Sequence, residues 1–206
     1  KMSKITNRSG FIPEGASAAT DIPASSQIWT KTVAGGSVLM HTNDAGVDHN
    51  INGIARSADF STATGTTVAV SGIPLGVEGI DICFEGVSTD GSGEMLIQLG
   101  TASGLETSGY RSRSVDDAGN DDGRTTHMII TYGVAAGNQL DGICSMRLKD
   151  SANNTWVWSG SWARSGTVGM NFFAGFKSLG GAITRFDLTN TAANTWDAGD
   201  LVLYYS

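Results

Sequence analysis

Hydrophobic and polar residues alternate with a period of two along most of the chain after Thr66. This period is typical of antiparallel strands that bury one face, and no segment keeps a helical period over about ten residues. The alternating segments are TTVAVSG, VEGIDICFEGV, EMLIQLG, THMIITYGV, LDGICSMRLK, TWVWSGSW, GMNFFAGFKS, AITRFDLTN and DLVLYYS. The pattern predicts an all-β protein, an antiparallel β-sandwich of jelly-roll type, because two packed sheets bury the alternating faces.

The most regular stretch runs from Gly72 to Thr101 and contains two hydrophobic runs joined by TDGSG. Two such runs around a short turn predict a hairpin. The stretch carries hardly any basic or nucleophilic side chain. A hairpin of this kind is expected in a protein that acts by presenting a contact surface and not by catalysis. In such a protein, rigid strands hold the loops that make the contacts.

The first part of the chain has a different composition. Its segment SGFIPEGASAATDIPASSQIW contains two of the three prolines and no sustained period. We therefore expect residues 1–64 to form an extended arm with one or two short strands, at residues 28–33 and around SVLMH, and residues 65–206 to form the sandwich. The arm is interpreted either as a loosely ordered leader or as a segment that docks onto a partner.

Composition and charge exclude several classes of protein. The 28 glycines and the excess of Asp over Glu (15 against 5) indicate many turns. A net charge of −7 with 13 scattered basic residues argues against binding to nucleic acid. No apolar run is long enough for a membrane-spanning helix, and the first residues lack the apolar core of a secretion signal. We expect no membrane insertion.

The two cysteines are predicted to be free thiols. In GIDICFEG, Cys83 alternates onto the more polar face, whereas Cys144 in LDGICSMRLKD shares a face with apolar residues. Two sulfurs in such different environments do not bond, which suits assembly in a reducing cytoplasm.

No motif indicates a metal or a cofactor. The acidic segment Asp116–Gly123 fails the spacing of a calcium-binding loop and lacks its closing Glu, so we interpret it as a solvated acidic loop that needs no metal. His41 and His49 lack the spacing that would aim them at one ion. G-x-S-x-G, H-E-x-x-H and phosphate-cradling glycine loops do not occur. We therefore expect a binding or structural protein and not an enzyme.

The segment NTWVWSGSW, with three tryptophans within seven residues, is the strongest indication of a binding site in the sequence. A continuous strand would place Trp156, Trp158 and Trp162 on one face, where indoles can form a platform for sugar rings. The alternative is that they fill the core between the two sheets. Gly160 favours a bulge that would rotate Trp162 away from the other two.

An ordered set of short motifs resembles a C-terminal domain of phage and prophage tail proteins. The motifs cover residues 65–206 in the family's order and are GTTVAVSGIP, FEGVS, LIQLG, TSGY, NTWVWSG, KSLGG and DAG. The resemblance implies a β-sandwich that assembles on the virion, with no catalytic residues to carry over. The enlarged acidic loop, the large Trp158 and Trp162, and the first 60 residues depart from the family's pattern.

From these observations we expect a virion protein of the tail-fibre or receptor-binding kind, made in the host cytoplasm, that contacts the host surface through loops. The candidate residues for binding a host glycan are Trp158, Trp162, Asp121 and Asp122. Two alternatives stay open: a capsid or tail decoration protein that binds other virion subunits through its arm, and a carbohydrate-active enzyme. The segments AVSGI and VLYYS lack the charged side chains that keep an exposed edge strand from pairing with other chains. Contact between identical copies would cover such edges, so we expect a homo-oligomer. The resemblance to tail proteins makes a trimer the first expectation.

Overall fold

The computed structural model describes residues 27–33, 36–42, 48–50, 55–63, 65–166 and 169–206. The chain divides into two compact units, Lys1–Ala55 and Arg56–Ser206. In the first unit β1 (Gln27–Val33), β2 (Gly36–Thr42) and β3 (Asp48–Asn50) form an antiparallel sheet in that order. The two expected strands are confirmed, and β3 was not expected. The pairing sets His41 opposite His49, a register that their spacing in the sequence did not suggest.

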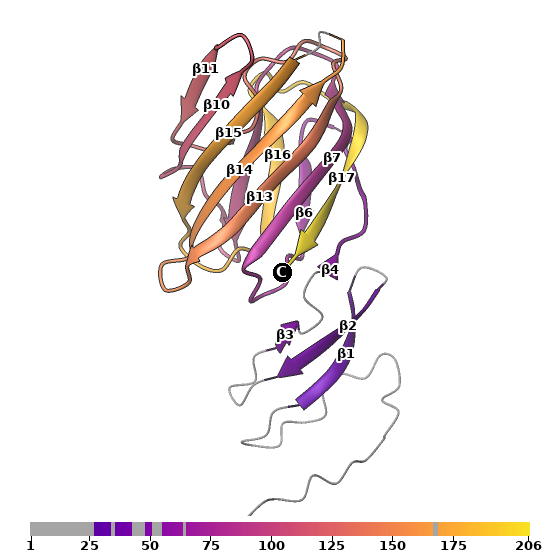
Figure 1. The fold of residues 1–206 in the computed structure, drawn as a ribbon, viewed down its shortest axis with the longest axis vertical. Coiled ribbons are helices and arrows are strands. Elements are labelled where there is room, and N and C mark those ends of the chain that lie inside the picture. The colour runs from indigo at the N-terminus through magenta and orange to yellow at the C-terminus, as the bar shows by residue number, and fades with distance from the viewer. Residues whose placement is uncertain (1–26, 34–35, 43–47, 51–54, 64, 167–168) are drawn as a thin grey trace, which may run out of the picture. The chain divides into compact units, whose positions relative to one another are not determined.

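The second unit consists of two antiparallel sheets that pack against each other, which confirms the β-sandwich (Figure 1). The larger sheet has the order β11-β10-β15-β14-β13-β7-β17-β4, with β5 also paired to β17. The smaller sheet has the order β12-β8-β16-β6, with β9 paired to β8. The jelly-roll connectivity stays a prediction.

The larger sheet is built from β4 (Ala55–Arg56), β5 (Phe60–Ser61), β7 (Gly79–Thr89), β10 (Arg111–Asp116), β11 (Asp121–Arg124), β13 (Leu140–Asp150), β14 (Thr155–Arg164), β15 (Gly169–Ser178) and β17 (Trp196–Tyr205). The smaller sheet is built from β6 (Val68–Ser71), β8 (Met95–Thr101), β9 (Gly104–Leu105), β12 (Met128–Ile129) and β16 (Arg185–Asn190). All nine alternating segments contain a strand, but β10 and β11 were not expected.

The sandwich unit begins earlier than the predicted boundary between residues 64 and 65. Both β4 and β5 pair with β17. The backbone N–H of Ser57 donates to the carbonyl oxygen of Leu203 at 2.8 Å, and the Thr62 hydroxyl donates to that of Ala198 at 2.6 Å. The end of the predicted arm is therefore part of the larger sheet.

The predicted hairpin between Gly72 and Thr101 is wrong. Strand β7 lies in the larger sheet between β13 and β17, whereas β8 lies in the smaller sheet between β12 and β16. The TDGSG segment therefore crosses from one sheet to the other. Sequence periodicity reports which side chains of a strand are buried, and it carries no information on which neighbour provides the hydrogen bonds.

The three tryptophans of β14 all point into the core, as a continuous strand requires. Trp156, Trp158 and Trp162 are 1%, 4% and 1% exposed. Gly160 makes no bulge, because the pairing of β14 with β15 runs without a shift from Thr155 to Arg164. A Cβ atom on Gly160 would lie 2.8 Å from Cε1 of Phe173. The absence of a side chain at Gly160 leaves room for the ring of Phe173.

The cysteines are both free, and they lie in different environments as predicted. Cys83 is partly exposed on the outward side of β7, and Cys144 is fully buried. Burial, with a smaller contribution from Asp81, raises the pKa of the Cys144 thiol.

Candidate functional site

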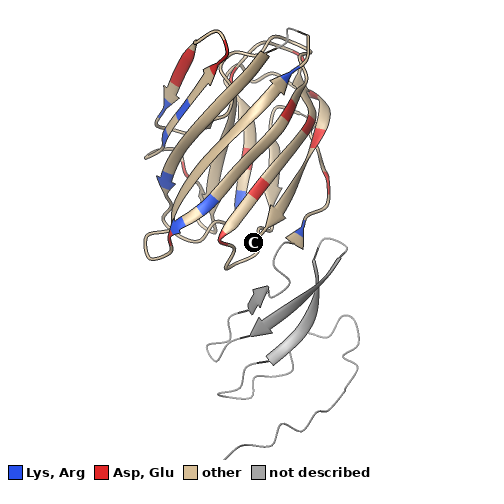
Figure 2. Cartoon of the chain, viewed as in Figure 1, with Lys and Arg blue, Asp and Glu red and all other residues tan. Residues whose placement is uncertain are grey.

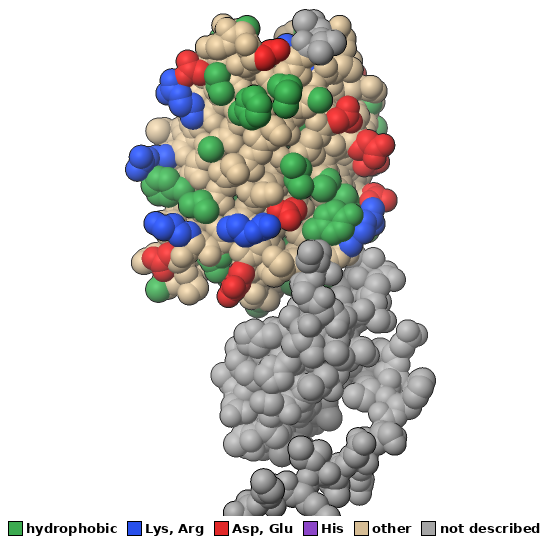
Figure 3. Space-filling view, viewed as in Figure 1, with side chains coloured by type: hydrophobic (Ala, Val, Ile, Leu, Met, Phe, Trp, Pro, Cys, Tyr) green, Lys and Arg blue, Asp and Glu red, His purple; other side chains and the backbone are tan. Residues whose placement is uncertain are grey.

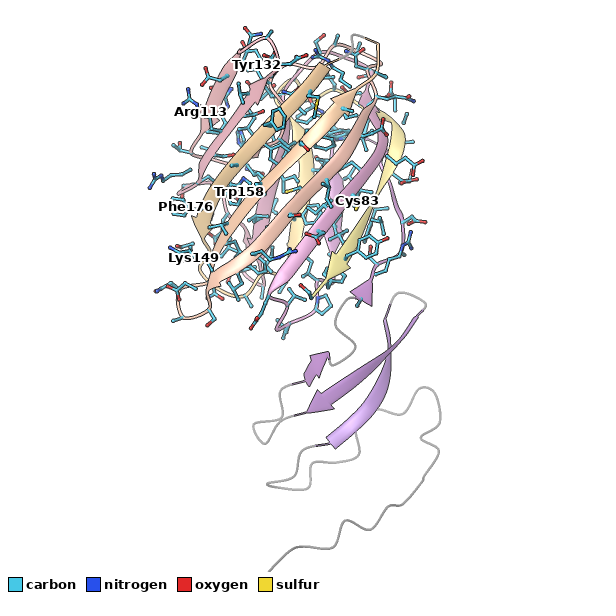
Figure 4. All side chains as sticks on the ribbon, in the orientation of Figure 1. Cys83, Arg113, Tyr132, Lys149, Trp158 and Phe176 are labelled. Atoms are coloured by element: carbon cyan, nitrogen blue, oxygen red, sulfur yellow. The ribbon has the colours of Figure 1, made fainter. Side chains whose placement is uncertain are left out.

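A groove of about 420 Å³ lies where the chain crosses between the sheets. It is lined by Ser92, Gly93, Glu94, Arg124, Tyr132, Gly133 and Thr191. These residues come from the crossing segment, from the end of β11, from the segment after β12 and from the residue after β16. Figure 4 labels Tyr132 near the end of the sandwich, at the level of β11.

Backbone hydrogen bonds hold these segments together. Gly93 and Val134 exchange two N–H to carbonyl bonds of 3.1 and 3.0 Å, an isolated bridge between the crossing segment and the segment after β12. Glu94 donates its N–H to the Thr191 hydroxyl at 3.1 Å, and Thr191 returns its own N–H to the Glu94 carbonyl oxygen at 3.1 Å. The groove is therefore bounded by loops that are fixed to one another.

One wall of the groove carries a cluster of three charged side chains. The guanidinium of Arg124 donates to both carboxylate oxygens of Glu94, at 2.6 and 2.7 Å, and lies 2.5 Å from the carboxylate of Asp122. Asp122 and Arg124 are two residues apart on β11, and Glu94 comes directly before β8 of the other sheet. Both bonds to Glu94 come from Nη2, and Nη1 lies beside Asp122, so two carboxylates hold the guanidinium from two sides.

The two carboxyl groups of this cluster differ in acidity. Burial raises the pKa of Glu94, and the nearby Asp122 adds to this effect against the opposing hydrogen bonds from Arg124. Slight burial acts in the same direction on Asp122, but the Gly123 N–H and Arg124 outweigh it and lower that pKa. On acidification Glu94 therefore takes up a proton before Asp122 does.

His127 borders the same cluster and is neutral. Burial lowers its pKa, and the Arg124 charge adds to that shift. Its Nδ1 atom lies 2.9 Å from the Thr126 hydroxyl, while its buried Nε2 atom has no hydrogen-bond partner. It lies half-buried in a bend before β12.

The two predicted acidic residues lie on strand β11, and not in a turn as expected. The acidic segment folds into a hairpin in which β10 pairs with β11. Asp121 pairs with Arg113, which Figure 4 labels at the outer edge of the sandwich. Only Asp122 reaches the cluster beside the groove. Residues 117–120 form the exposed turn of this hairpin, so the segment meets solvent as expected, but Asp121 and Asp122 belong to a strand and are ion-paired.

The predicted aromatic residues do not line the groove or any other surface. The indole of Trp162 packs against Phe84, with ring centroids 4.3 Å apart, and donates its N–H to the carbonyl oxygen of Ile130 at 2.8 Å. Trp158 packs against Tyr110 at 6.2 Å. Their burial contradicts the interpretation of these rings as a sugar platform, because a stacking platform needs an exposed face.

Sequence reasoning missed the residues that do line the groove. Glu94, Tyr132 and Thr191 stand in turn-rich segments far apart in the sequence, and only the crossing between the sheets brings them together. The one signal in the sequence was the position of Arg124 directly after the acidic segment Asp116–Gly123, which indicates an ion pair there.

The groove presents hydroxyl groups, one aromatic side chain and one carboxyl group. Ser92, Thr191 and Tyr132 supply hydroxyls, whereas the guanidinium of Arg124 is already engaged by Glu94 and Asp122. This lining suits an uncharged polyhydroxylated ligand better than an anion. Within the described ranges, no three His, Cys, Asp or Glu side chains gather to hold a metal ion.

Comparisons with protein-family models, curated proteins and solved structures find no match to this chain. Among the residues that the structure describes, no helix has the length and hydrophobicity to cross a membrane.

Proposed function

We propose that this chain is a virion structural protein of the tail-fibre or receptor-binding kind. In this proposal the loops around the groove bind a neutral glycan of the host surface and leave it chemically unchanged. The observation that carries the proposal is the groove itself, in which hydroxyl groups and the Tyr132 side chain surround an arginine whose charge is already neutralised. Sugar recognition uses this combination of hydrogen-bonding groups and an aromatic surface.

The motifs behind the family resemblance support a scaffold role for the strands. Tyr110, from TSGY, accepts the N–H of Leu99, from LIQLG, at 2.8 Å. The ammonium group of Lys177, from KSLGG, lies 5.2 Å from the centre of the Tyr110 ring. Leu179 of the same motif donates its N–H to the carbonyl oxygen of Asn154, from NTWVWSG, at 3.0 Å. Four motifs thus meet in one structural cluster, which leaves recognition to the loops.

Binding of the full chain to intact bacterial cells and to immobilised bacterial surface polysaccharides tests the proposal. We expect wild type to bind, and Tyr132→Ala to weaken binding about tenfold, the effect of losing an aromatic contact of about 1.4 kcal/mol. Leu75→Ala is the matched control, because Leu75 is 71% exposed and lies outside the groove. It should bind like wild type.

Three results would overturn the proposal. Release of oligosaccharide from the polysaccharide would identify an enzyme. Binding to purified phage shells or tubes with no binding to cells would identify a decoration protein. Unchanged binding of Tyr132→Ala would remove the groove as the site.

A further inference from the structure

The outward side of the larger sheet differs from an ordinary solvated sheet face. We call the outward-facing residues of β10, β15, β14, β13, β7 and β17 the outer face. Five large hydrophobic side chains are exposed among the described residues, and four of them lie on the outer face. Their exposed fractions are 37% for Val115, 41% for Ile143, 45% for Met170 and 51% for Phe172. An antiparallel sheet that meets water normally carries polar side chains there.

An uncharged row crosses the whole outer face at right angles to the strands. The pairing registers set its members directly opposite one another on neighbouring strands. From β10 to β17 the row reads Val115, Phe172, Ser161, Ile143, Cys83 and Val202. At about 4.8 Å between neighbouring strands the row is about 24 Å wide.

In the neighbouring rows, small and large outward side chains alternate along the strands. The next row places the small side chains Ala174, Ser159 and Ser145 beside one another, and the row after it is again large, with Phe176 and Val157. No outward position of β15, and none of β14 before its last residue, carries a charge. The outward positions of β15 and β14 thus form an uncharged band, whereas β13 beside them carries Asp141, Arg147 and Lys149. Figure 3 shows hydrophobic side chains exposed on this face among charged ones.

Charges of opposite sign lie at the two sides of the outer face. Arg111 and Arg113 project from β10, and Arg147 and Lys149 project from β13 together with Asp141. Asp81 and Glu85 of β7 and Asp200 of β17 project at the other side. Two of the arginines already have partners on the same chain, Arg113 with Asp121 and Arg147 with Asp81. Figure 2 shows basic residues on β10 and β13, and acidic residues on β7 and β17. If identical copies are related by an axis parallel to the strands, the basic side of one outer face meets the acidic side of the next.

The size of the outer face matches a stable interface. Strands of about ten residues rise about 33 Å, and with the width of about 24 Å they give an area on the order of 800 Å². Standard protein interfaces bury about 800 Å² on each partner, whereas the largest apolar patch of a monomer is commonly about 300–600 Å². The backbone groups of this face are already paired within the sheet, so side-chain packing would supply the contact.

We propose that the outer face is the interface between copies of this chain, which pack around an axis parallel to the strands. A flat surface of small and apolar side chains fits a second flat surface, because sheets pack face to face through interdigitating side chains. The proposal goes beyond glycan binding and does not depend on the groove. It gives the expected homo-oligomer a defined contact surface, and packing of the outer face against its own copy gives a dimer where a trimer was the first expectation.

Light scattering of the full chain at micromolar concentration is the test. Wild type should have a mass that is a multiple of the 21.4 kDa of one chain. Phe172→Asp and Ile143→Asp place a charge in the uncharged row, and each should reduce the mass to that of one chain. Leu75→Asp adds the same charge outside the outer face and should leave the mass unchanged. Retained β-sheet circular dichroism and a cooperative melt separate dissociation from unfolding.

Cys83 provides a second readout, because it belongs to the row and is partly exposed, while Cys144 is fully buried. A thiol reagent should modify Cys83 more slowly in the wild-type assembly than in the dissociated variants. A wild-type monomer would overturn the proposal. An oligomer that both Asp variants leave intact would overturn it as well.

Discussion

The indole nitrogen of Trp162 donates a hydrogen bond of 2.8 Å to the carbonyl oxygen of Ile130, whereas that of Trp158, four residues earlier on the same strand, has no partner. Ile130 directly follows β12 of the smaller sheet, so the bond of Trp162 joins the two sheets through the core. Both rings are buried and both point the same way from β14. The two tryptophans therefore form a natural pair for comparison.

We predict that Trp162→Phe destabilises the protein more than Trp158→Phe. Both changes remove similar volume, but only the first leaves a buried carbonyl oxygen without its donor, which costs about 1–3 kcal/mol. The second removes an N–H that is already unpaired. Urea unfolding followed by tryptophan fluorescence gives the two free energies of unfolding. Equal losses would show that the hydrogen bond adds nothing to stability.

The buried ion pair of Lys177 and Glu106 predicts a pH dependence. Burial raises the pKa of Glu106, but the bonds from Lys177 and from the Gly180 N–H outweigh it and lower that pKa overall. A lowered pKa gives stability that is complete above the ordinary value of 4.5 and is lost as the pH falls through the lowered value.

Glu106→Gln should therefore cost about 1–3 kcal/mol near pH 7, since the Lys177 side chain, 5% exposed, loses its counter-charge. The difference from wild type should shrink below pH 4.5 as Glu106 is protonated in the wild type. Glu78→Gln, at an exposed position, is the control. Urea titrations at the two pH values measure both effects, and a difference that grows on acidification would contradict the assignment.

Truncation tests the revised boundary of the sandwich. A chain of residues 55–206 keeps β4, β5 and the bond of 2.9 Å from the Leu203 N–H to the Ser57 hydroxyl. We expect it to melt cooperatively, and a chain of residues 65–206 to melt at a lower temperature because β17 loses β4 and β5 and keeps only β7 as a partner. Differential scanning calorimetry measures both. If residues 55–206 show no cooperative transition, the sandwich needs the first unit in order to fold.

Gly175 is predicted to tolerate no side chain. A Cβ atom there would lie 2.6 Å from Cζ2 of Trp158 and would also press on the backbone of Arg111. Gly175→Ala should cost about 1–3 kcal/mol through overpacking. Gly181→Ala is the control, because its Cβ atom would lie 3.8 Å from its nearest neighbour, Cβ of Thr101. Thermal melts that do not distinguish the two variants would contradict this packing.

Calcium should leave the melting temperature unchanged, and so should a chelator. The carboxylates of Asp121, Asp116 and Asp122 are engaged by Arg113, Asn120 and Arg124, and an ion would have to displace these partners. A rise of several degrees with Ca²⁺ would contradict this prediction, because a ligand that binds only the native state stabilises it by mass action.

The sequence by itself determined the strands and the direction of their side chains. Alternation with a period of two placed Trp156, Trp158 and Trp162 on one face and Cys144 on a buried face, because the direction of every second side chain is a local property of a strand. It did not decide that Trp158 and Trp162 face the core, and their choice as glycan-binding residues was wrong. Alternation did not predict the hairpin of β10 and β11, because its strands are short and carry mostly polar and charged residues, which are also typical of loops.

The tertiary structure alone decided which strands are neighbours and where side chains from distant segments meet. The pattern of β7 and β8 is the same for a hairpin and for a crossing between sheets, because either arrangement buries the same faces. That crossing brings Glu94 to Arg124, and the order of the larger sheet aligns Phe172 with Val115 and Ile143. Both the groove and the outer face are products of long-range pairing, which no local pattern of residues specifies.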